Sequence, residues 1–387
     1  MMKRIFVVTL IMAVGIILLF EESMAIPAFA RKYNMSCNVC HSPFPKLKPF
    51  GEEFAGNGLV LKDKEPPRFT IDTGDELLLL MREIPLAIRV EGYLRHQPQT
   101  VRRSDLQTPY LVKLISGGQV ARNVSYYFYF FLGERGEVAG LEDAFVMFNN
   151  IFGQDLDVVV GQFQVSDPLF KRELRLTFED YQIYRAKAGI SSVNLTYDRG
   201  VMMTYALPTS TDIVLEVLNG NGIGAADAVR SFDDDTYKNG MLRITQDVGE
   251  SFRIGAFGYL GNQEKNGFVN KTTMWGPDLT FSLDPVEINV QYVARTDDKP
   301  LFTPASIEQK TDGGIAEFVY RPEGDRSRWY GVFLYNWVNS DDARLNYRTA
   351  SAHAGYLVGR NFRVLGEYTY DLEQKANRFT AGFVAAF

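Results

Sequence analysis

The chain of 387 residues contains two cysteines, and both could take part in cofactor chemistry. Cys37 and Cys40 enclose two residues and are followed directly by His41, which gives the pattern C-x-x-C-H. In this pattern two thiols add to the vinyl groups of a haem, and the adjacent imidazole becomes an axial ligand of the iron. The two-residue gap sets the sulfur atoms at the spacing of the vinyl groups. The sequence therefore predicts one covalent haem c, held by Cys37, Cys40 and His41.

Two other interpretations of the same residues are a redox-active dithiol and half of a zinc site. A thioredoxin-like dithiol is expected in a βαβ context, and a structural zinc site needs a second pair of ligands. The sequence around Cys37 and Cys40 has neither. Two cysteines are also too few for a scaffold held together by disulfides.

The N-terminus has the pattern of a secretory signal. Lys3 and Arg4 precede an apolar run from residue 5 to residue 20, and Ser23-Met24-Ala25 has the small-residue pattern of a cleavage site. We expect residues 1–25 to be a signal peptide that is removed after Ala25, with an uncleaved membrane anchor as the alternative. Export agrees with a c-type haem, which is attached outside the cytoplasm.

Residues 26–83 are predicted to form a short haem-binding segment, similar to a small c-type cytochrome and mostly helix and loop. A segment of this size has little core of its own, so its walls are expected to come from the rest of the chain. The sixth ligand of the iron is predicted less directly. Met81 lies at a suitable distance downstream, with His353 and His96 as alternatives, whereas Met35 is too close to Cys37 to reach the opposite face.

From residue 84 onward the chain alternates apolar and polar residues with a period of two. Leu86, Ile88, Val90 and Leu94 share one parity, while Arg89, Glu91, Tyr93 and Arg95 share the other, so one face suits lipid and the other suits water. No apolar run long enough for a transmembrane helix follows Phe20. The alternating runs number sixteen: 84–95, 108–117, 120–132, 138–149, 155–164, 199–207, 211–219, 236–246, 251–262, 270–283, 285–295, 312–321, 327–338, 348–358, 361–371 and 376–387.

The connections between these runs also alternate, between short turns and longer loops. Outer-membrane barrels have short periplasmic turns and longer outer loops. The last run ends in Phe387 with aromatic and small residues on one parity, which is typical of the closing strand of such barrels. The short set comprises Gly118, 149–155, 208–210, 247–250, 284–285, 322–326 and 359–360, and the long set comprises 96–107, 165–198, 220–235, 296–311 and 339–347.

These observations predict an all-β fold, a sixteen-stranded antiparallel transmembrane β-barrel over residues 84–387, in the outer membrane of a Gram-negative cell. A soluble β-sandwich is the alternative, but it would have to bury the charged face of the first strand in its core. The formal net charge is −6 and the basic residues are scattered. Binding of nucleic acid, which needs a concentrated basic face, is therefore not expected.

Two stretches resemble known families. Residues 26–33, the C-x-x-C-H pattern and residues 44–51 together resemble the fused monohaem cytochrome–porins of iron-oxidising bacteria. The barrel looks similar to the phosphate-selective porins of the O and P group, through Gly161-Gln162-Phe163, Pro168 and residues 176–179, which resemble the inward-folding third loop of those porins. Residues 165–198 depart from that group, because acidic and basic residues are mixed and a purely basic anion filter is in doubt.

The first resemblance implies oxidation of extracellular Fe(II), with the electron passed through the haem to a periplasmic c-type cytochrome. This electron conduit, a possible ferrous iron oxidase, is the function that we expect. A solute channel with a haem-bearing plug and a conduit that exports electrons to an extracellular acceptor are the alternatives. Asp233, Asp234 and Asp235 lie in a predicted outer loop and could attract cations, although a solvated acidic loop tip is the more common explanation.

Overall fold

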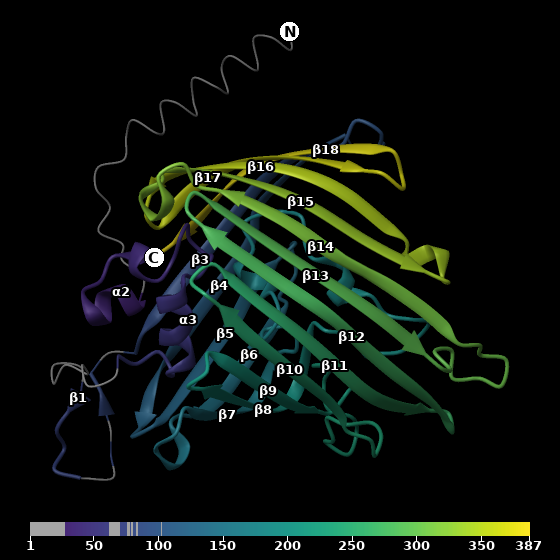
Figure 1. Ribbon diagram of the computed structural model, residues 1–387, viewed down its shortest axis with the longest axis horizontal. Coiled ribbons are helices and arrows are strands. Elements are labelled where there is room, and N and C mark those ends of the chain that lie inside the picture. The colour runs from purple at the N-terminus through teal and green to yellow at the C-terminus, as the bar shows by residue number, and fades with distance from the viewer. Residues whose placement is uncertain (1–27, 62–69, 76–77, 79, 83, 102) are drawn as a thin grey trace, which may run out of the picture.

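The chain forms a closed barrel in a computed structural model, which describes residues 28–61, 70–75, 78, 80–82, 84–101 and 103–387. Sixteen strands, β3 to β18, pair antiparallel around a complete ring. The ring closes where β18 pairs with β3, with Thr380 opposite Arg95 and Ala386 opposite Arg89. Figure 1 shows the strands running obliquely across the wall. The predicted sixteen-stranded barrel is confirmed, whereas the predicted signal peptide lies outside the described residues.

Each of the sixteen predicted runs corresponds to one strand, with ends that shift by a few residues. The strands are β3 (Leu86–His96), β4 (Ser104–Ala121), β5 (Val124–Glu134), β6 (Gly140–Phe148), β7 (Leu156–Gln164), β8 (Tyr197–Leu207), β9 (Thr211–Leu218), β10 (Asn239–Val248), β11 (Phe252–Lys265), β12 (Phe268–Leu283), β13 (Val286–Asp297), β14 (Gln309–Tyr320), β15 (Trp329–Ser340), β16 (Tyr347–Gly359), β17 (Phe362–Asp371) and β18 (Ala376–Ala386).

Short turns lie at the end of the barrel that holds the C-terminus, and most of the longer loops lie at the other end, as the sequence predicts. The two-residue turn 266–267 between β11 and β12 also lies at the long-loop end. Among the predicted short turns, the exception is Gly118, which does not form a turn. β4 continues through it to Ala121, with Gly118 paired to Tyr126, and the chain turns at residues 122–123. Glycine interrupts the sequence pattern there, but in the fold it lies within the strand, with the sulfur of Met81 beside it.

The two faces of the wall have opposite character, as the period of two predicts. In β3 the apolar Leu86 and Leu94 are exposed on the outside, whereas Arg89, Glu91 and Tyr93 are buried on the inside. The same pattern continues around the barrel, so that the exterior carries a broad apolar surface. A surface of this kind, on a closed barrel whose backbone groups are paired, suits contact with lipid.

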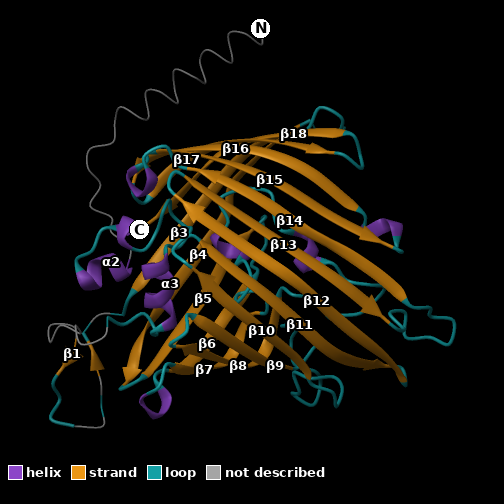
Figure 2. Cartoon of the chain, in the orientation of Figure 1, coloured by secondary structure: helices purple, strands orange, loops and turns teal. Residues whose placement is uncertain are grey.

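The N-terminal segment is built from short elements at the short-turn end of the barrel. They are α2 (Ala28–Tyr33), the 3-10 helix η1 (Cys37–Val39), α3 (Pro49–Gly56), β1 (Thr70–Ile71) and β2 (Leu80–Met81). In Figure 2 both helices lie beside the barrel end that holds the C-terminus. Within the described residues, no helix has the length and apolar character needed to cross a membrane.

Contacts from several sides of the wall hold this segment in place. Asn149 Nδ2 donates to the Gly56 carbonyl at 2.8 Å, and Arg321 Nη1 donates to the Ser42 carbonyl at 3.0 Å. Lys46 forms a 2.7 Å ion pair with Glu287 of β13. Gly58 approaches the wall so closely, with φ +70°, that a Cβ atom there would stand 2.1 Å from Ser125 Oγ. The segment is therefore a plug docked in this mouth.

The loop of residues 165–196 folds into the barrel, which confirms the inward loop expected from the sequence resemblance. It contains the 3-10 helices η4 (Arg172–Leu174) and η5 (Gln182–Arg185), while η3 (Ile151–Gly153), η6 (Gly324–Arg326) and η7 (Ala343–Leu345) lie in other connections. Tyr184 and Leu195 of the loop are fully buried and belong to one cluster with Met241, Tyr259 and Ile315 of the wall. One side of the lumen is thus filled by an apolar core.

We predict that the exterior face is in lipid, and a charge placed on it tests this. Ile244 lies at the middle of β10 and faces outward, whereas Val248 faces outward at the end of the strand. Ile244→Arg should lower the free energy of unfolding by about 2–4 kcal/mol, and the matched Val248→Arg by about 0–1 kcal/mol, because the cost of a buried charge depends on depth. Urea unfolding in phospholipid vesicles measures both. Equal costs at the two positions would show that the wall does not contact lipid.

Candidate functional site

The C-x-x-C-H residues adopt a tight turn that brings their side chains together. Cys37 begins the 3-10 helix η1 and Cys40 follows its end, with the amide of His41 donating to the Cys37 carbonyl at 2.9 Å. Residues three apart in a 3-10 helix are eclipsed, so both sulfur atoms lie on one side of the turn. The cysteines are free thiols, partly exposed, and burial raises the pKa of each.

His41 is held in the state that an axial ligand requires. Its Nδ1 lies 2.9 Å from the Pro45 carbonyl, which can only accept, so Nδ1 carries the proton. Burial lowers the pKa of His41 to about 4, and the imidazole is therefore neutral at pH 7. Its Nε2 then presents a lone pair. A backbone carbonyl that fixes the ring and tautomer of a metal-binding histidine in this way is a common supporting contact.

A cavity of about 280 Å³ lies between this turn and the inner wall of β3 to β6. Cys37, Cys40 and His41 line one part of it. The other lining is mostly apolar and aromatic and includes Phe44, Phe54, Ile115, Tyr127, Phe145 and Met147. This chemistry fits a flat, largely apolar macrocycle, so the fold supplies the walls that the short segment lacks.

Two buried cations also line the cavity. Arg89 is paired with Glu91, and Lys113 forms a 3.0 Å ion pair with Glu173 of the inward loop while lying 3.4 Å from the centre of the Tyr129 ring. Haem carries carboxylate side chains at one edge, and cations are their usual partners. The cavity therefore combines an apolar lining with two cations, and a haem has both an apolar ring and charged carboxylates.

The predicted distal ligand Met81 does not line the cavity. It lies on β2 at the mouth of the barrel, where its sulfur packs on Gly118. His353 is also elsewhere, bonded through Nδ1 to Glu367 at 3.1 Å inside the lumen, and His96 lies at the outer end of β3, 2.8 Å from Ser104 Oγ. Two other methionines do line the cavity, Met35 and Met147. Met147 was not among the residues singled out in the sequence. Nothing in its local sequence indicates that this apolar residue of β6 lines a cavity beside the N-terminal segment.

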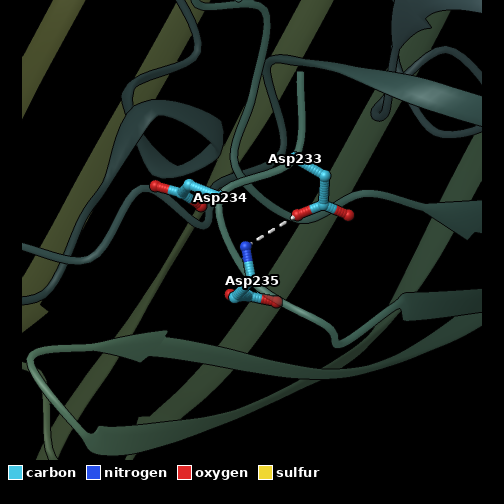
Figure 3. Close-up of side chains that lie close together, drawn as sticks. All are labelled: Asp233, Asp234 and Asp235. Carbon is cyan, nitrogen blue, oxygen red and sulfur yellow. Dashed lines mark hydrogen bonds between the residues drawn. The ribbon is translucent and has the colours of Figure 1, made fainter. Parts of the chain in front are cut away.

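The acidic residues of the outer loop lie close together. One ligand atom from each of Asp233, Asp234 and Asp235 falls within 4.8 Å of the others. Figure 3 shows the three side chains, with the amide of Asp235 donating to Asp233 at 3.3 Å. Lys238 forms an ion pair with Asp233. These contacts explain the cluster as a self-contained acidic loop tip.

The inward loop carries charges of both signs, and they neutralise one another. Asp180 is paired with Arg172 and lies 3.8 Å from Arg175 and 3.5 Å from Arg185. Lys171 is bonded to Asp167 at 2.5 Å. The structure thus has no purely basic filter along the described part of this loop, in agreement with the departure from the phosphate-porin pattern.

Solved structures of outer-membrane channels share this fold. No protein-family profile matches the chain, and no curated protein matches it in sequence. An anion-selective porin from Comamonas acidovorans has a TM-score of 0.57 at 10% identity, with 79% of this chain and 99% of that chain covered. The outer membrane channel DcaP of Acinetobacter baumannii has a TM-score of 0.55 at 15% identity, with coverages of 79% and 97%. The chain therefore has the fold of outer-membrane porins.

Proposed function

We propose that the protein is an outer-membrane electron conduit that uses one covalent haem c in the plugged mouth of its barrel. The observation that carries this proposal is the cavity shared by Cys37, Cys40 and His41 with the apolar barrel wall. A porin that only passes solutes has no need of a neutral, oriented imidazole beside two free thiols. The bound haem would supply one-electron redox chemistry, while the protein sets its potential and access.

The residues of the chain have separate roles in this proposal. Cys37 and Cys40 form the thioether bonds, and His41 Nε2 is the proximal ligand. The Pro45 carbonyl keeps the ring oriented through its 2.9 Å hydrogen bond. Met147 would supply the distal ligand, because it lines the cavity from strand β6, and Met81 does not line it. Arg89 and Lys113, which already pair with Glu91 and Glu173, would be shared between these residues and the carboxylates of the cofactor.

Fe(II) outside the cell is the proposed electron source, and a periplasmic c-type cytochrome is the proposed acceptor. The similarity of residues 26–51 to the cytochrome–porins supports this direction of flow. One haem is much smaller than an apolar slab of about 30 Å. The acceptor therefore has to come close to the plugged mouth, where the short turns leave the N-terminal segment accessible.

A solute channel is the second candidate, and the fold likeness favours it. The similar structures include an anion-selective porin and a channel protein. The contacts of the plug argue for the conduit. Glu287, Asn149 and Arg321, from separate parts of the wall, each bind the N-terminal segment. The apolar filling by residues 165–196 narrows the lumen further.

The first prediction concerns covalent haem. Wild-type protein made in a host that matures c-type cytochromes should retain haem after denaturation, and Cys37→Ser/Cys40→Ser should lose it, because no thioether bond can form. A haem stain on a denaturing gel and the visible spectrum measure this. Adding Fe(II) should give a reduced c-type spectrum in the wild type, and His41→Ala should not give that spectrum because it lacks the proximal ligand. Absence of haem from the wild-type protein would contradict the electron conduit and leave the porin as the function.

A second prediction concerns the distal ligand. Met147→Leu keeps the volume of the side chain but removes the thioether, so it should abolish the sulfur-to-iron charge-transfer band of the oxidised protein and lower the reduction potential. Met81→Leu and the outward-facing Met203→Leu are matched controls and should retain the band. Loss of the band in Met35→Leu or Met81→Leu, with Met147→Leu unchanged, would assign the ligand to another methionine.

A third prediction separates the two functions. In a planar lipid bilayer, the intact protein should show little steady conductance, because the plug and the inward loop occupy the lumen. Glu287→Gln/Asn149→Ala removes two anchors of the plug and should raise the frequency of open events. The control Glu308→Gln alters an exposed outer-loop carboxylate that forms no contact with the plug. A large, stable conductance in the unaltered protein would favour the solute channel.

A further inference from the structure

A second cavity, of about 630 Å³, lies at the long-loop mouth of the barrel. We refer to it as the vestibule. It lies between the outer ends of β3 and β4 and the inward loop, and it has eight charged lining residues. These are Arg95, Arg135, Arg175, Arg185, Arg378, Asp105, Glu179 and Asp180, that is, five arginines and three carboxylates.

The charge that the vestibule presents to water is positive. The side chains of Arg135 and Arg185 are 51% and 41% exposed, whereas those of Glu179 and Asp180 are 5% and 12% exposed. Both of these carboxylates are occupied within the protein. Asp180 is shared by three arginines, and Glu179 is bound by Arg378 and by the hydroxyl of Tyr347. The third carboxylate, Asp105, is 52% exposed and lies 3.8 Å from Arg95. With five arginines against three carboxylates, the lining keeps an excess of positive charge.

An aromatic wall separates the vestibule from the haem cavity. Tyr110 and Phe178 line the vestibule, and their rings lie 5.0 and 4.8 Å from that of the buried Tyr93. Phe44 packs against the same cluster from the other side, lines the haem cavity, and lies 5.2 Å from the His41 ring. Aromatic rings thus lie at both ends of the space between the vestibule and His41, with Tyr93, Tyr110 and Phe178 in mutual contact at the vestibule and Phe44 beside His41, and Phe44 packs against the cluster that contains Tyr93.

We propose that the vestibule is the docking site of the electron donor, and that this donor is an anionic complex of Fe(II), such as iron held by a carboxylate chelator. The proposal rests on the proposed function and names the class of its substrate. The step moves one electron and no atoms: the chelated Fe(II) becomes Fe(III), and the oxidised haem becomes reduced. The oxidised complex keeps its ligands and leaves by the outer mouth.

Hydrated Fe(II) fits this site poorly. A divalent cation would be repelled by the exposed arginines, and the buried carboxylates that could hold it already have cationic partners. Asp233, Asp234 and Asp235 are not among the residues that line the vestibule, and Lys238 offsets part of their charge. Chelation solves the problem of charge, because it surrounds the iron with carboxylates that guanidinium groups bind well.

The test compares donors of opposite charge on the full-length haem-loaded protein. Stopped-flow absorbance follows haem reduction by the ferrous complex of EDTA, a dianion, and by hexaammineruthenium(II), a dication. Arg135→Gln/Arg185→Gln should slow reduction by the anion about 10-fold, the low end of what focused charge contributes to association, and should not slow reduction by the cation. The wild-type rate with the anion should fall as salt is added. Arg253→Gln is the matched control at the opposite mouth, with a side chain 39% exposed.

The outcomes separate the two proposals. If dithionite produces no c-type spectrum in the wild type, the proposed function fails and the donor site fails with it. A normal dithionite spectrum with equal rates in wild type and the double variant overturns the vestibule alone. Slowing by Arg253→Gln but not by the double variant would place the donor at the short-turn mouth. A faster reaction with the cation in the wild type would contradict the anionic donor.

Discussion

The pairing of β18 with β3 is the interaction on which the rest of the structure depends. Backbone amides and carbonyls left unpaired in an apolar medium are costly, so a wall of strands there has to close on itself. Closure places every polar face inside one lumen. Closure also brings Arg89 of β3 and Met147 of β6 to one cavity, which they line together with the N-terminal segment. The cavity beside Cys37, Cys40 and His41 exists because the ring is complete and its mouth takes the plug.

A polar lumen creates a second requirement, since buried charges need partners. The inward loop answers it with pairs such as Lys113 with Glu173 and Arg172 with Asp180. These contacts attach the loop to the wall while its apolar side fills the lumen beside β10 to β15. The lumen is therefore divided, with a charged vestibule at one end and an apolar cavity at the other.

Features that depend on local pattern were predictable from the sequence. The alternation of apolar and polar residues predicted the strands and which side chains face outward, such as Leu86, or inward, such as Arg89. The residues between the strands predicted the alternation of short and long connections. Gly118 shows the limit of local pattern, because it lies within β4, paired with Tyr126, and not in a turn. The C-x-x-C-H residues were recognisable because their chemistry fixes their spacing. Met147 could not be found in this way, since its place opposite the plug depends on the closed ring and on the docking of Gly56 and Gly58.

The aromatic wall between the two cavities follows from the same constraints. A conduit has to exclude water and ions from the interior while it keeps donor and acceptor near each other. Charged side chains would carry water with them, and aliphatic ones would leave gaps around a flat ring. Tyr93 and Phe178 pack edge to face, with their ring centres 4.8 Å apart. The hydroxyl of Tyr93 finds its partner in Glu91 at 2.7 Å, and Glu91 in turn neutralises Arg89 at the haem cavity. The barrier to solutes and the charge balance of the cavity are thus built from the same strand.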